Sequence, residues 1–288
     1  MVELYCSWCK GLPESKEALK MLKDSGVFTG IELSNTDFQA DKIIDAGLKV
    51  SIHNPVREFK INLDNASFTE ILNAHPEIIS HCNKTELPFV SFHTNYIPSL
   101  NPATSYELVL KNVKDNLNKI KNTLSKKVLF ETSCGFGKSQ EYVVSELLFK
   151  CTHPSFAKQI LSETSAGVLI DISHVLASAS LHKVYNNYPN EVKDFFLDYL
   201  SVCSKSTYEM HINSTRINEQ GLYIDRHFPL NPEEKETQLA FECATEVINS
   251  CPNIETVVLE VEPNLDPINH VKLLIQQAQL FEKMVLKK

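Results

Sequence analysis

The chain has 288 residues, of which 43% are hydrophobic and 22% are charged. These proportions are typical of a folded globular protein with a sizeable core. The formal net charge is −8, and there are only three arginines, Arg57, Arg216 and Arg226. This balance argues against a broad basic surface, which non-specific binding to nucleic acid requires.

The sequence shows no sign of a secretory signal or a membrane span. The N-terminal stretch MVELYCSWCK lacks a basic region followed by an apolar one, and no apolar run approaches ~18 residues. Eight scattered cysteines are typical of reduced thiols. Two of them, Cys6 and Cys9, have CxxC spacing, which suits redox or metal chemistry but in isolation is more often incidental. We predict a cytoplasmic protein without membrane contact.

Eight short apolar runs have the character of β-strands, and helical patterns lie between most of them. The expected strands are 2–6, 30–34, 49–53, 89–93, 128–132, 167–172, 208–212 and 256–261. The expected helices are 14–25, 67–83, 104–123, 139–150, 154–163, 189–203, 232–250 and 266–285.

This alternation predicts a closed (β/α)₈ barrel. A doubly wound open sheet is the structural alternative. No linker-like stretch divides the chain, so residues 1–288 are expected to form a single domain. Only residues 39–46 separate the second and third strands, so the second helix should be shortened to one or two turns.

Six of the strands end in residues of the types that bind metal ions. The first five follow one another at intervals of about forty residues, the length of a strand, a loop, a helix and a return loop. Parallel strands bring their carboxyl ends to one face, where barrel active sites lie. The six residues are His53, His93, Glu131, Asp171, His211 and Glu260.

Two further motifs add candidates. His174 follows Asp171 in the sequence DISH, where the strand is expected to pass into a loop. Asp225 and His227 belong to DRH in the segment 213–231, and alternate residues of an extended segment point the same way. Nine ligands without a thiolate suit two or three divalent ions, with zinc favoured over iron or manganese.

Each candidate alone has a structural explanation, such as a hydrogen-bonded histidine or a salt-bridged carboxylate. However, an ionised carboxylate at the end of an apolar strand is costly unless it is paired or bound to metal. We therefore predict a metalloenzyme, with the carboxylates Glu131, Asp171 and Glu260 as its catalytic residues. The other five histidines are expected at the surface: His75, His81, His153, His182 and His270.

Motifs along residues 49–263 resemble those of the endonuclease IV (AP endonuclease family 2) group within the xylose-isomerase-like TIM barrels. They are HNPVREFKINLDNAS, SFHTNY, FETSCGFGK, VLIDISHVLASAS, HINS, IDRHFPLN and VVLEVEP. The resemblance implies a trinuclear zinc cluster that cleaves the phosphodiester 5′ to an abasic site in DNA.

The resemblance also implies how the ligands divide. Glu131 would bridge two ions, one held with Asp171, His211 and Glu260. The other bridged ion would be held by His93 and His53. The third ion would be held by His174, Asp225 and His227.

The sequence departs from the family in ways that bear on DNA recognition. The family's N-terminal His-Val-Ser element is absent, and the loop after the second strand, which enters DNA in the family, is very short. Val56 stands where an aromatic residue follows the first ligand histidine, and HINS lacks the acidic residue usual after Asn213. The cluster chemistry is therefore better supported than recognition of abasic DNA.

Two related groups share the scaffold and remain alternatives. Sugar isomerases and epimerases use one metal ion, which Glu131, Asp171, His211 and Glu260 would hold. Multinuclear non-haem iron oxidases that modify peptide cysteines use a similar set, usually with Asn where His174 stands, and often work with a partner protein. The leading expectation is metal-dependent phosphodiester hydrolysis, with small-molecule or peptide substrates as the alternatives to DNA.

Overall fold

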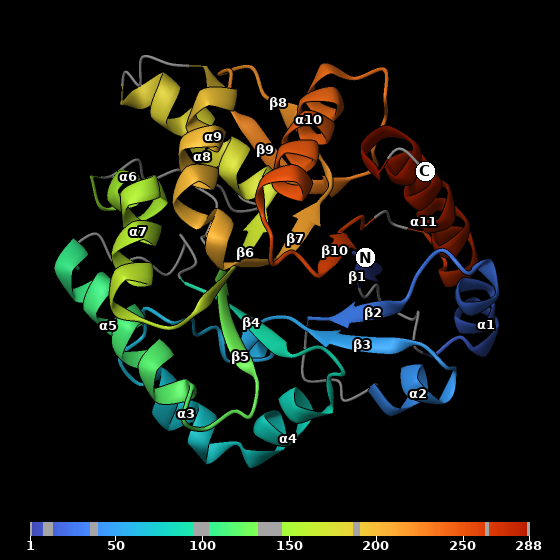
Figure 1. The fold of residues 1–288 in the computed structure, drawn as a ribbon, viewed down its shortest axis with the longest axis horizontal. Coiled ribbons are helices and arrows are strands. Elements are labelled where there is room, and N and C mark those ends of the chain that lie inside the picture. The colour runs from blue at the N-terminus through green and yellow to red at the C-terminus, as the bar shows by residue number, and fades with distance from the viewer. Residues whose placement is uncertain are drawn as a thin grey trace.

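The computed structural model describes residues 2–7, 14–34, 40–94, 104–131, 146–186, 191–262 and 265–286. Eight parallel strands form one sheet, and helices surround it (Figure 1). The strands are β1 (Glu3–Ser7), β2 (Gly30–Leu33), β3 (Lys49–Ile52), β4 (Phe89–His93), β5 (Lys127–Glu131), β6 (Gly167–Asp171), β7 (Thr207–Ile212) and β10 (Thr256–Leu259).

The strand order is β3-β2-β1-β10-β7-β6-β5-β4, and each strand is parallel to its neighbours. The two end strands meet through a single parallel bridge between His53 and Ser91. The sheet therefore closes on itself. The predicted (β/α)₈ barrel is confirmed, and the open-sheet alternative is wrong.

The helices of the described part follow the strands in the expected alternation. They are α1 (Lys16–Ser25), α2 (Ala40–Asp45), α3 (Phe68–Ala74), α4 (Pro76–Lys84), α5 (Tyr106–Ile120), α6 (Glu146–Thr152), α7 (Pro154–Glu163), α8 (Ile172–Tyr185), α9 (Val192–Cys203), α10 (Lys235–Ser250) and α11 (Pro267–Phe281). Short 3₁₀ turns lie at Arg57–Phe59 and Ser204–Ser206, and a π-helical turn at Glu282–Leu286 follows α11.

Three expectations about helices and strands need correction. The stretch 67–83 is two helices, because Pro76 starts a new one directly after His75. Helix α8 was missed, and His174 lies in its first turn instead of a loop. The segment 213–231 contains a hairpin formed by β8 (Ser214–Ile217) and β9 (Tyr223–Phe228). The shortened second helix is confirmed, since α2 has six residues.

The inside of the barrel changes from apolar to polar along the strands. Successive side chains of a strand point to opposite faces, so every second residue points inward. In β4 these residues are Phe89, Ser91 and His93, in that order, and all three are largely removed from solvent. The end near the strand starts is filled by an apolar cluster of Tyr5, Leu87, Phe89, Leu129, Leu169 and Val258. The polar residues at the other end are therefore held over a packed floor.

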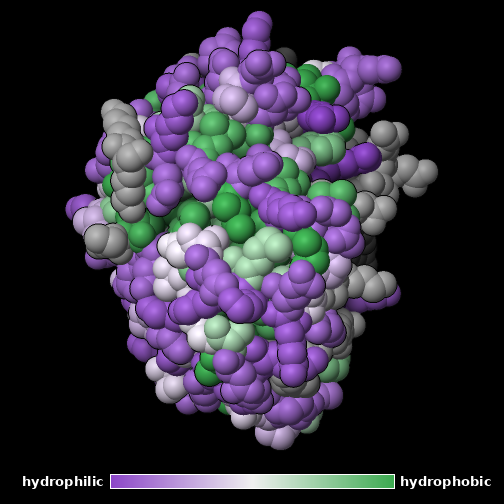
Figure 2. Space-filling model, turned by 90° about the vertical axis from the view of Figure 1, so that its right-hand side faces the viewer, coloured by the Kyte–Doolittle hydropathy of each residue, from purple (hydrophilic) through white to green (hydrophobic). Residues whose placement is uncertain are grey.

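Figure 2 shows the face of the molecule on the side of α1 and α11. Hydrophilic side chains cover most of this face, and apolar side chains lie between them. A depression of about 540 Å³ there is lined by charged residues such as Glu17 and Lys20 as well as by Met21 and Ile275. In the described part of the chain, no helix has both the length and the apolar character that crossing a membrane requires.

Candidate metal centre

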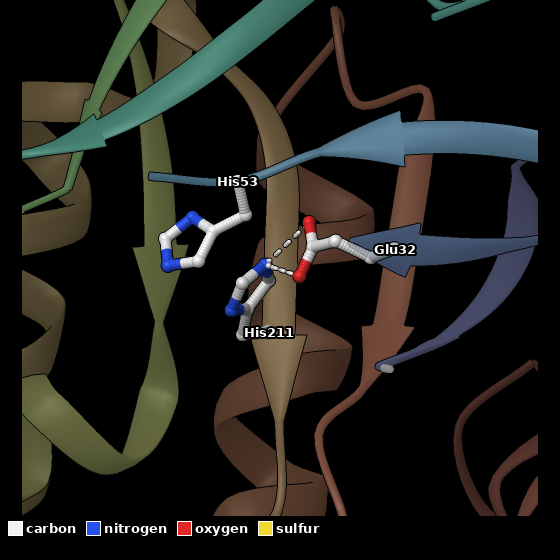
Figure 3. A group of neighbouring side chains, drawn as sticks. All are labelled: Glu32, His53 and His211. Atoms are coloured by element: carbon white, nitrogen blue, oxygen red, sulfur yellow. Dashed lines mark hydrogen bonds and ion pairs between the residues drawn. The ribbon is translucent and has the colours of Figure 1, made fainter. Parts of the chain in front are cut away.

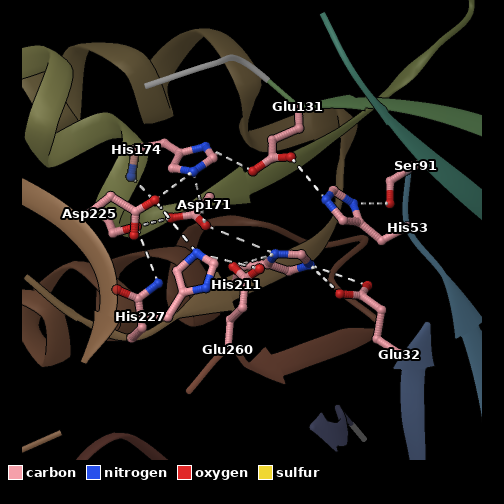
Figure 4. A network of polar contacts seen from close by, with 12 residues as sticks. Glu32, His53, Ser91, Glu131, Asp171, His174, His211, Asp225, His227 and Glu260 are labelled. Carbon is pink, nitrogen blue, oxygen red and sulfur yellow. Dashed lines mark hydrogen bonds and ion pairs between the residues drawn. The ribbon is translucent and has the colours of Figure 1, made fainter. Parts of the chain in front are cut away.

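All nine predicted ligands lie in the described part of the chain, and the structure brings their side chains together at the carboxyl ends of the strands (Figure 4). Six come directly from strand ends, as expected. His174 is supplied by α8, and Asp225 and His227 are supplied by β9. The side chains form contiguous groups of imidazoles and carboxylates.

The first group consists of His53, His93 and Glu131. His93 Nε2 lies 2.9 Å from both His53 Nε2 and Glu131 Oε2, and the third separation, from His53 Nε2 to Glu131 Oε2, is 3.4 Å. Donor atoms about 2.1 Å from one ion lie about 3 Å apart when they are at right angles. These three atoms therefore have the spacing of ligands on one face of an ion. Ser91 Oγ, 2.9 Å from His53 Nδ1, occupies the other ring nitrogen of His53.

The second group consists of Asp171, His211 and Glu260. His211 Nδ1 lies 3.3 Å from Glu260 Oε2 and 4.0 Å from Asp171 Oδ2. Asp171 ends β6 and also caps α8, because its Oδ1 accepts a hydrogen bond from the backbone N–H of His174. The remaining oxygen, Oδ2, is directed toward the group.

The third group consists of His174, Asp225 and His227. Asp225 Oδ2 lies 3.2 Å from His174 Nε2 and 3.5 Å from His227 Nε2. The pairing of β8 with β9 shifts register between Ser214 and Thr215, and His227 has a φ of 51°. A bulge re-aims a side chain at the cost of local strain. His227 therefore reaches the group through a bulge and not through regular extended alternation.

Glu131 connects the groups. Its Oε2 faces His53 and His93, and its Oε1 lies 2.9 Å from His174 Nδ1. Oxygen and nitrogen atoms of Glu131, Asp171 and His174 all approach within 4.8 Å of one another. A carboxylate with one oxygen in each of two donor groups is placed to bridge two cations.

Four buried oxygen and nitrogen atoms of these groups have no hydrogen-bond partner. They are Glu131 Oε2, Asp171 Oδ2, His211 Nδ1 and His227 Nδ1. Buried polar atoms in folded proteins are normally satisfied, and a set of unsatisfied oxygen and nitrogen atoms fits the needs of divalent cations. The residues present therefore fit a metal site.

Burial and the neighbouring charges shift the protonation of the groups. Burial lowers the pKa of His53 well below its ordinary value, which favours the neutral imidazole that binds metal. Burial opposes ionisation of Glu131, but His93 and His174 bring its pKa well below the usual range. Burial, together with the nearby Glu260, raises the pKa of Asp171 to about 7 despite His174. Cation binding at this centre would therefore displace protons and strengthen as the pH rises.

The structure adds acidic residues that the sequence analysis missed. Glu32, at 1% exposure, lies within 3.2 Å of His211 Nε2, and Glu262 Oε2 lies 3.4 Å from His227 Nδ1. A signal for Glu32 was present, since it interrupts the apolar strand GIELS at an inward position. Cys6 is buried in β1, with its Sγ 4.0 Å from the carbonyl oxygen of Gly30, and Cys9 lies outside the described residues.

The fold of the chain is similar to that of several solved TIM barrels. It is similar to the zinc-bound IolI protein, with a TM-score of 0.68 at 12% identity over 98% of this chain and 99% of that one. It is also similar to a xylose isomerase domain containing protein from Salmonella typhimurium LT2 (TM-score 0.62, 11% identity, 97% of both chains). Endonuclease IV from Thermus thermophilus gives a TM-score of 0.58 at 11% identity, covering 99% of this chain and 100% of that one.

Sequence comparison finds a relative over part of the chain. A UPF0276 protein from Psychromonas ingrahamii is 23% identical over 195 residues, which are 63% of this chain and 62% of that protein. The match thus spans less than two thirds of the relative's length. No family model matches the chain. The likeness to solved structures is one of fold, and the reaction has to be argued from the site.

Proposed function

We propose that this protein is a multinuclear non-haem iron oxidase that acts on a thiol-bearing peptide. The observation that carries the proposal is the face formed by His53, His93 and Glu131. Two histidines and one carboxylate on one face of an ion, with other positions open, are typical of non-haem Fe(II) oxygenases. When bound there, ferrous iron would supply the activation of dioxygen.

The surrounding residues have defined tasks in this proposal. Ser91 holds the Nδ1 edge of His53, so that Nε2 faces His93 and Glu131. Glu131 joins this face to the groups around Asp171 and His174 through its second oxygen. Ions held by these groups would supply redox chemistry at one location, with dioxygen as the oxidant and the peptide as the source of the electrons.

The proposed substrate class is argued from the types of ligand atom that the described residues offer. The donor groups of the described residues contain only nitrogen and oxygen ligands. A thiolate is a strong ligand for iron, so a cysteine of the substrate would be the sulfur ligand at an open position. The acidic chain, with net charge −8, makes a peptide a better-matched substrate than a polyanion such as DNA.

The test is to purify the protein anaerobically, count its metals, and measure oxygen consumption with a cysteine-containing peptide. We expect two or three iron ions per chain and oxygen uptake that requires both iron and the cysteine. His93→Ala should abolish uptake, whereas His75→Ala, at a half-buried histidine outside the groups, should leave it unchanged. Two or three zinc ions with no oxygen uptake by the iron-loaded protein would contradict the proposal, and a single manganese or cobalt ion would favour an isomerase.

Phosphodiester hydrolysis at abasic or otherwise damaged DNA is the second candidate. The third group, His174, Asp225 and His227, supports it, because this is the trio that the resemblance to endonuclease IV assigns to a third ion. Metal ions lower the pKa of bound water and neutralise the charge of both oxygens in phosphodiester cleavage. The six-residue α2 and the buried Val56 leave little to wedge into a duplex, so exposed or single-stranded sites should be preferred.

This candidate is tested by incubating zinc-loaded protein with duplex and single-stranded DNA that carry one abasic site. Incision that Glu131→Ala abolishes, with no oxygen uptake by the iron-loaded protein, would replace the oxidase proposal with this one. If incision does not rise above that of Glu131→Ala, the hydrolase candidate is removed. The metal count and the two activity measurements together separate the candidates.

A further inference from the structure

Glu32 is a buried carboxylate on β2 that none of the three donor groups requires. Its side chain points into the barrel and faces His211 on the side away from Asp171 and Glu260 (Figures 3 and 4). Both of its oxygens are close to one ring nitrogen, with Oε1 3.2 Å and Oε2 3.3 Å from His211 Nε2. A carboxylate in this place accepts hydrogen bonds, and it can accept one from a proton on Nε2.

The other ring nitrogen of His211 faces the candidate metal centre. Nδ1 lies 3.3 Å from Glu260 Oε2, and the side chain of His211 is fully buried. Since an imidazole has two ring nitrogens, a proton held on Nε2 leaves Nδ1 as the atom that can bind a cation. The two edges of the ring thus have different partners.

We propose that Glu32 is a positioning residue, which holds the proton on His211 Nε2 and so makes Nδ1 the ligand atom. Such a carboxylate–histidine–metal arrangement fixes the orientation of the ring and makes the ligating nitrogen more basic. The inference rests on the metal centre of the proposed function but not on the reaction that the centre performs.

His53 provides a contrast within the same site. Its ring lies 5.1 Å from that of His211, centroid to centroid, and the two planes are inclined by 66°. In His53 it is Nδ1 that meets a partner, Ser91 Oγ, and Nε2 that faces the donor group. His53 and His211 therefore direct different ring nitrogens, Nε2 and Nδ1, toward the candidate metal centre. In each ring, the residue that contacts the other nitrogen explains this difference.

Glu32 is itself contacted by Ser51 on the neighbouring strand β3, and Ser51 in turn contacts Glu209 on β7. Ser51 Oγ lies 3.5 Å from Glu32 Oε2 and 3.4 Å from Glu209 Oε1, and all three residues are at most 1% exposed. Ser51 thus contacts both carboxyl groups, and the side chain of Glu32 is held in place beside His211.

The decisive measurement is nuclear magnetic resonance of the zinc-loaded protein with ¹⁵N-labelled histidine. Long-range proton–nitrogen correlations distinguish a ring protonated at Nε2 from one protonated at Nδ1. The resonances of His211 are assigned by their absence in His211→Gln. We expect a proton on Nε2 and none on Nδ1 in the unaltered protein, and the reverse pattern would overturn the inference whatever any variant does. If zinc does not bind, the metal centre and this inference fail together.

Two variants then test the role of Glu32. Glu32→Met removes the acceptor and should weaken zinc binding by about 10- to 100-fold at the His211 site. Glu32→Gln keeps an acceptor oxygen and should retain the Nε2 proton and most of the affinity. Glu77→Gln, which removes the same charge from an exposed helix, is the matched control. Glu32→Met that folds and binds zinc as tightly as the control would overturn the inference. If Glu32→Met does not fold, Glu32→Gln provides the test. Loss of the Nε2 proton in that variant without loss of zinc affinity would overturn the inference.

Discussion

The carboxylate of Asp171 accepts a hydrogen bond from the backbone N–H of His174 at 3.0 Å, so the residue that ends β6 also begins α8. Oδ1 caps the helix, and Oδ2 is buried without a hydrogen-bond partner. A single side chain thus performs two tasks with its two oxygens. It orients the helix that carries His174, and it contributes an oxygen to the candidate metal centre.

Substitutions at Asp171 should separate these two tasks. Asp171→Asn keeps an oxygen that can cap α8, whereas Asp171→Ala removes it, which costs about 1 kcal/mol. Because burial raises the pKa of Asp171 to about 7, the neutral amide should leave the metal-free protein at least as stable as the carboxylate does. Urea unfolding of metal-free proteins checks the cap, and metal counts check the ligand. Equal stability of the two variants would contradict the capping role.

Removal of single ligands should show how many ions the centre holds. With three ions, His227→Ala should lose one metal equivalent and keep the fold. Glu131→Ala should disturb two ions, because the two oxygens of Glu131 face separate donor groups. His75→Ala is the control, since this histidine lies on the surface beside Glu77. Elemental analysis and circular dichroism provide the readouts. An unchanged metal count in His227→Ala would argue against a third ion.

Acid should lower the free energy of unfolding of the metal-free protein, partly because of His182. This side chain is buried, its Nε2 lies 3.1 Å from Thr152 Oγ1, and burial lowers its pKa to about 4. Between its ordinary pKa of 6.5 and about 4, the unfolded chain takes up a proton that the folded chain does not. The free energy of unfolding should therefore fall as the pH drops through this window. His182→Gln should show a shallower fall than His75→Gln, measured by urea unfolding at several pH values, and equal slopes would contradict this.

Gly30 should tolerate no side chain. It lies at an inward position of β2, and a Cβ there would overlap the carbonyl oxygen of Lys49 and the ring of Tyr5. Overpacking of this kind costs about 1–3 kcal/mol or more where the neighbour is backbone. Gly26→Ala, where nothing lies within 4 Å but φ is +65°, provides a control for the strain of a left-handed residue alone. In urea unfolding, Gly30→Ala should be much less stable than Gly26→Ala. Comparable losses of stability in the two variants would contradict the proposed clash.

The closed barrel was predictable because each strand is a short apolar run and the runs recur at regular intervals. The meeting of the nine ligand candidates was predictable because six of them end strands that point to one face. Their roles as ligands stay a proposal. The stretch 172–182 gave no helical signal, because every residue in it is buried and no polar face alternates with an apolar one. His81, His182 and His270 were wrongly expected at the surface, since a polar residue in a helix pattern does not show which way it points.

Glu32 could not be identified from sequence by spacing alone. It lies in the middle of the apolar run GIELS and not at the end of the strand. Its importance depends on its distance to His211, which is 179 residues away in sequence. The bulge that orients His227 could not be predicted from sequence for a similar reason. It arises from the pairing between β8 and β9 and not from the DRH motif itself.

The barrel closes at its weakest point through residues of the candidate metal centre. β3 and β4 are joined by the single bridge between His53 and Ser91, whereas the other neighbouring strands pair over three or more registered positions. His53 and His93, from either side of this seam, face each other at 2.9 Å. A cation bound to both histidines would link β3 to β4 and so stabilise the closed barrel. Removal of this cation by a chelator should then speed amide exchange at Asn54, whose N–H donates to the carbonyl oxygen of Ser91 across the seam. Exchange in the other strands should respond later.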